Sequence, residues 1–272
     1  MITKRFIHND LSREYHVFGN GSEVLYSFHG FGQAAIEWKT FEVWLEKRFT
    51  VYAFADFLHE QSEISSEQIA DHRLEKNEIA EFFSAFAKVE GHSEIKLMAY
   101  SSGGRTALTL LELTPFEINE LWLFAPDGIK ISFWNNLFCS YNFIQNLYKK
   151  IIKNPEMFFS FTRFLNQVGV INSSLTGFVL NSMRNQEKRQ KIYDYWMIYR
   201  DIVPDIESII ITLNNSKIKL HLIFGKNDKI ISVKIGRNFK RRANKNVDLL
   251  ELDSGHQLID KKHLKILLEH YS

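Results

Sequence analysis

A chain of 272 residues can form one large domain or one domain that carries an insertion. Its apolar fraction of 45% and its charged fraction of 24% are those of an ordinary globular protein, and a net charge of +2 gives no argument for nucleic-acid binding. A single cysteine, Cys139, excludes an internal disulfide and a zinc site built from cysteines.

The start of the chain and its longest apolar runs bear on localisation. Residues 1–8 contain no apolar segment and no cleavage signal of the secretory type. Two charge-free runs, at 131–148 and 164–183, are long enough to raise the question of a membrane span, but Asn, Gln, Ser and Thr interrupt both. We therefore predict a soluble, cytoplasmic protein with no membrane span.

Short apolar runs of strand length alternate along the chain with segments at helical spacing. An antiparallel pair is predicted first, at 4–7 and 13–18. Six further strands are predicted at 23–28, 50–55, 95–100, 120–124, 218–224 and 247–252. Helices are predicted at 66–89, 104–113 and 261–271. This alternation predicts an α/β fold, with a mostly parallel sheet covered by helices on both faces.

Residues 128–205 interrupt the alternation, because they contain no strand-like run and read as several amphipathic helices. We predict a helical lid here, inserted into a core formed by 1–127 and 206–272. This segment contains ten Lys and Arg and five Asp and Glu, an excess of positive charge. The excess would either attract an anionic acyl carrier or belong to an ordinary solvated face. Its aromatic side chains either line a pocket or pack the helices together: Phe133, Trp134, Phe138, Phe158, Phe159, Phe161 and Trp196.

One serine has the surroundings of a nucleophile. The strand predicted at 95–100 runs directly into Ser101, with Ala99 two residues before it, Gly103 two residues after it and a helical pattern following. A nucleophile on a tight turn between strand and helix adopts a strained backbone, and only small residues at these offsets avoid a clash. Such a turn would direct the N–H of Ser102, at the helix N-terminus, toward the serine oxygen. The alternative is a serine that caps an ordinary helix.

This segment resembles the nucleophile elbow of the α/β-hydrolase superfamily, G-x-S-x-G, with Ala99 in place of the first glycine. Three further segments carry the resemblance: FHGFG at 28–32, FGKND at 224–228 and LDSGH at 252–256. The resemblance implies a catalytic triad of Ser101, Asp228 and His256. It also implies an oxyanion hole formed by the backbone N–H groups of Phe31 and Ser102.

Two points stay open within this resemblance. Asp127 is the alternative acid, although Pro-Asp-Gly at 126–128 is a turn signature in its own right. The segment 56–62 lacks glycine where relatives often carry D-x-x-G-x-G-x-S, so similarity in this loop does not assign a subfamily. Of the other histidines, His29 belongs to the oxyanion loop, and we expect the following to be solvated: His59, His72 and His92.

The resemblance implies hydrolysis of a carboxylic ester or thioester through an acyl-enzyme, with no metal or organic cofactor. The partner is then a small-molecule substrate with an apolar acyl group, and the oligomeric state is left open. The candidate substrate-binding residues are Phe31, Tyr100, Phe133, Trp134 and Phe138. A hydrolase of carbon–carbon bonds, an acyltransferase and a non-catalytic binding protein remain alternatives of the same fold.

Overall fold

The computed structural model describes residues 1–64, 74–113, 116–130, 141–171, 176–177, 180–181, 183–243 and 246–271. The chain divides into two compact units. The first comprises Met1–Ser66, Leu74–Ile131 and Asp201–Ser272, and the second comprises Glu67–Arg73 and Ser132–Arg200. Among the described residues, every helix is too short or too polar to cross a membrane.

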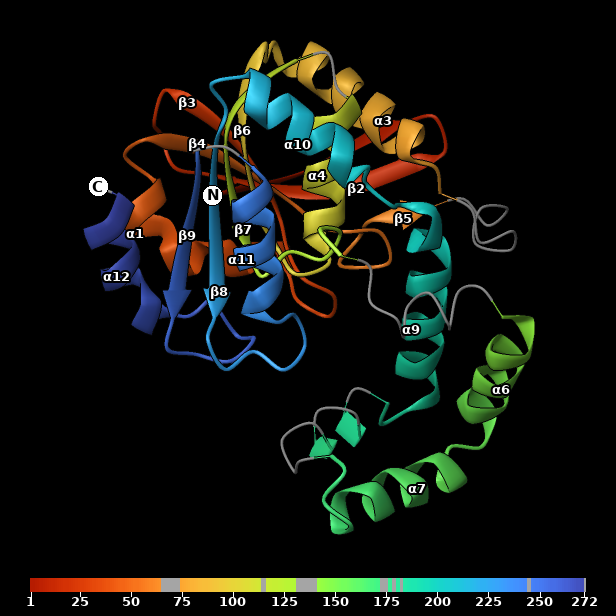
Figure 1. Cartoon of the computed structure of the whole chain (residues 1–272). Helices are drawn as coiled ribbons and strands as arrows, with labels where there is room; N and C mark the ends of the chain where they lie inside the picture. The colour runs from red at the N-terminus through yellow and green to blue at the C-terminus, as the bar shows by residue number, and fades with distance from the viewer. Residues whose placement is uncertain are drawn as a thin grey trace. The chain divides into compact units, whose positions relative to one another are not determined.

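A single sheet of nine strands forms the centre of the first unit (Figure 1). The strands are β1 (Ile2–His8), β2 (Leu11–Phe18), β3 (Glu23–Phe28), β4 (Phe49–Phe54), β5 (Glu63–Ile64), β6 (Glu94–Tyr100), β7 (Glu117–Phe124), β8 (Lys219–Gly225) and β9 (Val247–Leu252). Their order is β1-β2-β4-β3-β6-β7-β8-β9, with β5 beside β2. Strand β2 pairs antiparallel with β1, β4 and β5, whereas all pairs from β4 to β9 are parallel. The predicted α/β fold with a mostly parallel sheet is confirmed.

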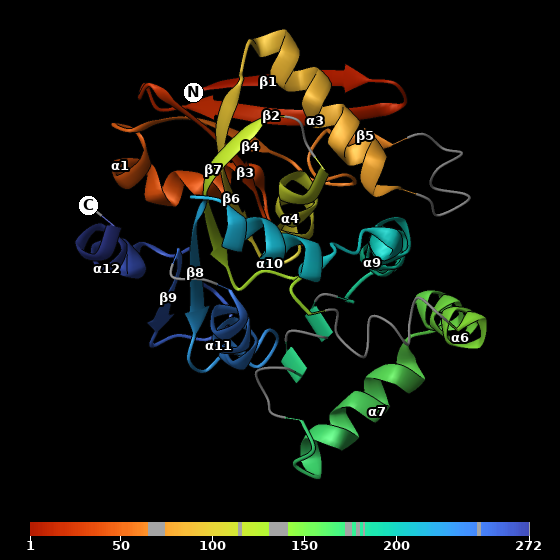
Figure 2. The same cartoon turned by 45° about the horizontal axis from the view of Figure 1, so that its top comes forward.

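Helices cover both faces of this sheet (Figure 2). One face carries η1 (Ala35–Phe41), α1 (Glu42–Leu45) and α12 (Lys261–Tyr271). The other face carries α3 (Lys76–Glu90), α4 (Gly103–Leu113), α10 (Ile206–Asn215) and α11 (Val233–Arg242). Because the central strands are buried on both faces, their sequences are continuous apolar runs and not an alternation of apolar and polar residues.

Aromatic rings fill the space between α3 and the sheet, and several of the chain's 23 phenylalanines lie there. Phe54 contacts Phe83 edge-on at a centroid distance of 4.9 Å and Phe86 at 5.0 Å. Tyr26 lies 5.3 Å from Phe54 and 5.5 Å from Phe86 in the same orientation. Edge-to-face pairs of this kind contribute about 0.5–1.5 kcal/mol each beyond the burial of their area. The aromatic residues of this part of the chain therefore build the core.

The second unit contains α6 (Asn142–Lys153), α7 (Glu156–Gln167) and α9 (Gln186–Ile198), and η2 (Tyr199–Asp201) follows α9 in the chain. Ile152 of α6 packs against Tyr193 and Met197 of α9 in a small buried cluster. Arg189 of α9 donates hydrogen bonds to the carbonyl oxygens of Ile152 and Met183, at 3.0 and 2.8 Å. The described residues between 128 and 205 include helices and no strand. Their role as a lid stays a prediction.

Candidate active site

Ser101 lies in the turn between β6 and α4 with a left-handed backbone, at φ 51°. Its N–H donates to the carbonyl oxygen of Phe124, at 3.0 Å. Its own carbonyl oxygen accepts from the N–H groups of Gly104 and Asp127, at 2.9 and 2.7 Å. A positive φ costs a non-glycine residue about 1–3 kcal/mol and persists only where the surrounding structure holds it. The three hydrogen bonds, to the end of β7, to the segment that follows it and to α4, provide that support.

The first turn of α4 packs directly on the loop that follows β3. A Cβ atom at Gly103 would lie 2.6 Å from the carbonyl oxygens of Phe28 and His29, so the close approach of the two segments requires glycine. The Ser101 turn and the loop at 28–33 are therefore neighbours. This arrangement brings the segments that contain Phe31 and Ser102 to the same end of the sheet.

Three side chains distant in sequence form a hydrogen-bonded chain. Ser101 Oγ lies 3.0 Å from His256 Nε2, and His256 Nδ1 lies 2.7 Å from Asp228 Oδ2. A carboxylate can only accept, so Nδ1 carries the imidazole proton and Nε2 is left to accept the proton of the serine hydroxyl. The imidazole is 18% exposed, whereas the Asp228 side chain is fully buried. The geometry matches that of a nucleophile, a base and an orienting acid.

Backbone hydrogen bonds hold the Asp228 carboxyl group in place after β8. Its Oδ1 accepts from the N–H groups of Ile230 and Ile231, at 2.7 and 2.9 Å. The preceding turn lies against the loop that carries the histidine, since the N–H of Asn227 donates to the carbonyl oxygen of Ser254 at 2.9 Å. The carboxyl group is thus fixed relative to His256 by contacts on both of its oxygens.

Replacing Gly225 with alanine is expected to destabilise the first unit by about 1–3 kcal/mol, the usual effect of overpacking. The new Cβ would lie 2.1 Å from the carbonyl oxygen of Gly255, a backbone atom that a side-chain rotation cannot move away. Denaturant unfolding checks this, with Gly255→Ala as the matched control because a Cβ there meets open space. Equal midpoints for the two variants would contradict the predicted clash.

The alternative acid, Asp127, has a different partner. Its Oδ2 accepts from Nε of the buried Arg105 at 2.7 Å, and its Oδ1 accepts from the N–H of Gly128 at 2.9 Å. These contacts fasten the end of β7 to α4, while the Asp127 N–H supports the Ser101 turn. The structure therefore brings Asp228 to His256 and pairs Asp127 with an arginine.

The comparisons with known proteins concern the fold. No protein-family model matches the chain, and no curated protein matches its sequence. An α/β-hydrolase enzyme from a Medee basin deep-sea metagenome library is 14% identical, with a TM-score of 0.70 over 98% of this chain and 97% of that one. A thermophilic esterase from Thermogutta terrifontis is 11% identical, with a TM-score of 0.69 over 99% and 98% of the two chains. The chain has the α/β-hydrolase fold.

A third solved structure, an α/β-hydrolase fold protein from Burkholderia ambifaria, is 16% identical, with a TM-score of 0.68 over 98% of this chain and 96% of that one. The resemblance drawn from the sequence motifs is thus confirmed for the fold. In this α/β-hydrolase fold the three hydrogen-bonded side chains follow the carboxyl ends of β6, β8 and β9. Open parallel sheets place their ligands at that edge.

Two histidines in the loops after β3 and β4 are buried, and for one of them the sequence expectation was wrong. His59 is only 2% exposed, although we expected it to be solvated. His92, for which we expected the same, is half-buried beside the Tyr26 hydroxyl. His72 lies outside the described residues. His59 is buried because both ring nitrogens find backbone partners: Nδ1 lies 3.0 Å from the Phe57 carbonyl oxygen, and Nε2 accepts from the N–H of Gly32 at 2.9 Å.

His29 gives the first unit a dependence on acid pH. Burial lowers its pKa from the ordinary value of 6.5, against the opposing effect of Asp56 and the Gly30 carbonyl group. Below pH 6.5 the unfolded chain therefore binds a proton that the folded chain does not, and the free energy of unfolding falls as the pH falls toward the folded pKa. His29→Gln should reduce this slope by up to about 1.4 kcal/mol per pH unit. Urea unfolding at several pH values measures both slopes, and parallel curves would refute the assignment.

Of the five candidate substrate-binding residues, the structure describes two, Phe31 and Tyr100. Phe31 is half-buried, and its ring meets that of His59 edge-on at 5.3 Å. Tyr100 is 4% exposed, and its hydroxyl donates to the carbonyl oxygen of His256 at 2.9 Å. Tyr100 therefore supports the loop of the catalytic histidine candidate, and a contact of either ring with substrate stays a prediction. Phe133, Trp134 and Phe138 lie outside the described residues.

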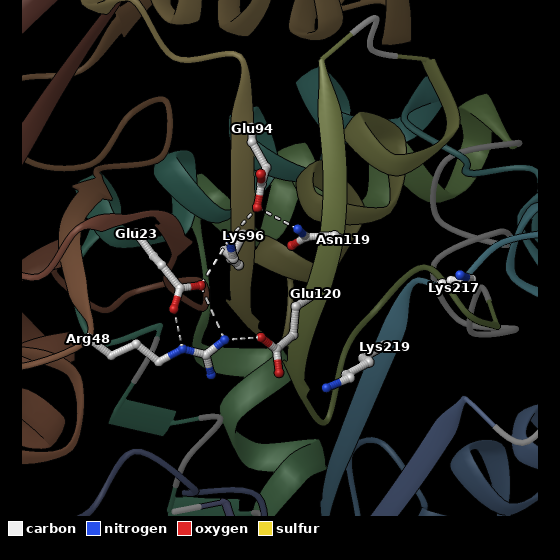
Figure 3. A pocket seen from close by; sticks show the side chains of 8 residues that line it. All are labelled: Glu23, Arg48, Glu94, Lys96, Asn119, Glu120, Lys217 and Lys219. Carbon is white, nitrogen blue, oxygen red and sulfur yellow. Dashed lines mark hydrogen bonds and ion pairs between the residues drawn. The ribbon is translucent and has the colours of Figure 1, made fainter.

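A pocket of about 300 Å³ lies near the opposite edge of the sheet (Figure 3). Its charged side chains lie at or near the amino ends of parallel strands, and several of them are linked by ion pairs (Figure 3). Arg48 pairs with Glu23 at 2.7 Å and with Glu120, and Lys96 pairs with Glu23 at 2.9 Å. Burial alone would raise the pKa of Glu120, but hydrogen bonds from His221 and Arg48 lower it. The ion pairs bind the strand starts together, far from Ser101.

One further group has the residue types of a metal site. Donor atoms of Glu14, His16 and Glu60 lie within 4.8 Å of one another. His16 Nε2 lies 3.0 Å from Glu60 Oε1, and His16 Nδ1 lies 2.9 Å from the Thr3 hydroxyl. The second oxygen of Glu60 accepts from the N–H of Ala35 at 3.1 Å. These donor atoms already bind one another and the protein, so the group is an internal hydrogen-bond network.

Proposed function

We propose that the protein is a serine hydrolase that cleaves a carboxylic ester or thioester through an acyl-enzyme. The observation that carries the proposal is the continuous hydrogen-bonded chain from Ser101 through His256 to Asp228. The α/β-hydrolase fold supports it, since the three residues follow carboxyl strand ends. The strained backbone at Ser101 supports it as well, because such strain concentrates at functional positions.

In the proposed mechanism the Ser101 hydroxyl attacks the carbonyl carbon of the substrate. Its proton passes from Oγ to Nε2 of His256, and Asp228 stabilises the imidazolium through the hydrogen bond to Nδ1. The tetrahedral intermediate collapses, the leaving alcohol or thiol takes the proton from Nε2, and the acyl group stays on Oγ. Water then attacks the acyl-enzyme by the same route and releases the carboxylic acid.

The negative charge of the tetrahedral intermediate needs stabilising donors. We assign this role to the N–H groups of Phe31 and Ser102, which belong to neighbouring segments at one end of the sheet. The N-terminal end of α4 adds a favourable dipole at the same place. One such donor is worth about 10²–10³ in kcat in a comparable hydrolase.

A fluorophosphonate probe tests the proposal, because it reacts only with a serine whose base and oxyanion hole are both in place. Intact-mass spectrometry should show a single adduct, and peptide mapping should place it on Ser101. A protein that remains unlabelled over hours would instead support the non-catalytic binding protein. An adduct on a different serine would move the nucleophile and leave the hydrolase class standing.

We further propose an apolar acyl group of small to medium size, because ligand pockets are lined mainly by apolar and aromatic side chains. One of the two assigned donors belongs to Phe31, whose half-buried aromatic ring is a candidate for such a lining. Each buried methylene contributes about 0.8 kcal/mol, so kcat/KM should rise about fourfold per methylene until the pocket is full. Assays with p-nitrophenyl esters of two to eight carbons measure this. A flat profile would favour the carbon–carbon hydrolase or the acyltransferase.

A further inference from the structure

Two loops at the carboxyl ends of adjacent parallel strands are tied together by a reciprocal pair of histidines. His29, in the loop after β3, accepts at Nε2 from the N–H of Asp56, in the loop after β4, at 2.9 Å. His59, in the loop after β4, accepts at Nε2 from the N–H of Gly32, in the loop after β3, at 2.9 Å. The two rings meet edge-on with their centroids 5.1 Å apart.

The partners of these rings determine their tautomers. A backbone N–H can only donate, so Nε2 of each ring is unprotonated, and the proton is on Nδ1. Each Nδ1–H then faces a carbonyl oxygen of its own loop, that of Gly30 for His29 at 2.8 Å and that of Phe57 for His59 at 3.0 Å. Both rings therefore have a donor and an acceptor function in use, and each needs the neutral Nδ1–H form.

These hydrogen bonds fix two consecutive peptide groups around Phe31. The Gly30 carbonyl group and the Phe31 N–H belong to one planar trans peptide, so holding the oxygen toward His29 points the N–H the opposite way. The next peptide, which contains the Gly32 N–H, is held by His59. Gly32 has φ 77°, a region where glycine moves freely, so this peptide needs an external restraint.

The loop that presents His59 is itself built to be rigid. Leu58 and Glu60 on either side have positive φ, at 62° and 50°, which non-glycine residues adopt only when the surroundings enforce it. The loop starts at Asp56, whose carboxylate accepts from the buried Arg13 at 3.0 Å. Near its end, Glu60 accepts from the N–H of Ala35, which gives a second contact with the segment after β3. A strained loop anchored at both ends is suited to hold a neighbour in place.

We propose that His59 is a positioning residue that orients the oxyanion loop by holding the Phe31–Gly32 peptide. The inference rests on the proposed function, since it assigns the Phe31 N–H to the oxyanion. His59 acts through the loop and not on the substrate, so its loss should lower the rate of the chemical step and leave ground-state binding nearly unchanged. This separates it from a residue that only stabilises the fold.

The test compares His59→Phe, which keeps an aromatic ring without an acceptor, with His59→Gln, which keeps an amide oxygen able to accept from Gly32. For p-nitrophenyl ester hydrolysis we expect His59→Phe to lower kcat by about tenfold to a hundredfold, below the full loss of one oxyanion donor, with KM within about threefold of wild type. His59→Gln should recover most of that loss.

The matched control is His92→Phe. This half-buried histidine also has a ring nitrogen in a hydrogen bond, 2.8 Å from the Tyr26 hydroxyl, but it precedes the amino end of β6. Its replacement should lower the thermal midpoint and leave kcat within twofold of wild type. Equal kcat for His59→Phe and wild type would overturn the proposal. So would a His59→Gln variant as slow as His59→Phe, or a fall in kcat that His92→Phe reproduces.

A measurement on the unaltered protein covers the case in which His59→Phe does not fold. Nitrogen-15 spectra of histidine-labelled protein at pH 7.5 should show His59 as the neutral Nδ1–H tautomer, and an Nε2–H tautomer would overturn the proposal because that ring cannot accept from Gly32. Ser101→Ala in the same esterase assay tests the serine hydrolase function separately from the positioning role of His59. Turnover in that variant at a tenth of the wild-type rate or more would contradict the proposed function, whereas the outcomes above concern His59 alone.

Discussion

Ser101→Ala is expected to lower kcat by about a millionfold, to the level left by binding and oxyanion stabilisation alone, the loss seen when the nucleophile of a comparable triad is removed. The variant removes the only oxygen in the turn that lies within hydrogen-bonding distance of His256 Nε2 among the described residues. It leaves the backbone hydrogen bonds of the turn available, and so the fold should be retained.

Initial rates with a p-nitrophenyl ester measure this loss, and active-site titration guards against contamination by a few molecules of wild type. The thermal midpoint should stay within a few degrees of wild type, because the variant keeps the backbone hydrogen bonds of the turn and loses a single part-buried side-chain hydrogen bond. A variant that retains a tenth of the wild-type rate would contradict the nucleophile assignment, whatever its stability.

Asp228→Asn is expected to lower kcat by about 10⁴-fold, as the equivalent change does in a comparable triad, because the imidazole is then held in the wrong tautomer. The amide oxygen can still accept from the N–H groups of Ile230 and Ile231. The amide nitrogen then faces His256 Nδ1 and donates to it, so the proton moves to Nε2, where it faces Ser101 and blocks proton acceptance.

The matched control for this change is Asp127→Asn, at the carboxyl end of the neighbouring strand. It weakens the contact with Arg105 but leaves the hydrogen bond between His256 and Asp228 intact. Its effect should therefore fall on stability, with kcat within about tenfold of wild type, since it acts only through the Ser101 turn. The reverse ranking of the two variants would assign the acid role to Asp127.

The sequence predicted the central strands well, because strands buried on both faces are continuous apolar runs. It missed α10 and α11 for different reasons. The first half of α10 is rich in isoleucine, whose Cβ-branched side chain favours a strand. The helix forms nevertheless, and the Asp205 carboxylate caps it by accepting from the N–H of Ser208 at 3.1 Å. In α11 half of the residues are charged and few are apolar, so no apolar run of helix length marks it in the sequence.

In the candidate site, too, one part could be predicted from the sequence and another could not. The geometry around Ser101 follows from local sequence, since small residues at fixed offsets and a following helix are enough to predict the turn. The burial of His59 does not, because its ring is held by a contact with a residue far away in the chain, the N–H of Gly32. The absence of glycine from 56–62 was the available signal, and it indicated an unusual loop without indicating its role.

The separation of the two edges of the sheet has a consequence for engineering. The ion pairs around Glu23, Arg48 and Lys96 lie at the amino ends of the strands, whereas Ser101 follows a carboxyl end. A strand of six residues spans about 20 Å, beyond the range of about 7–10 Å within which substitutions usually influence one another. Libraries that vary the two edges should therefore combine additively, so that thermal resistance and substrate preference can be selected in separate rounds and then joined.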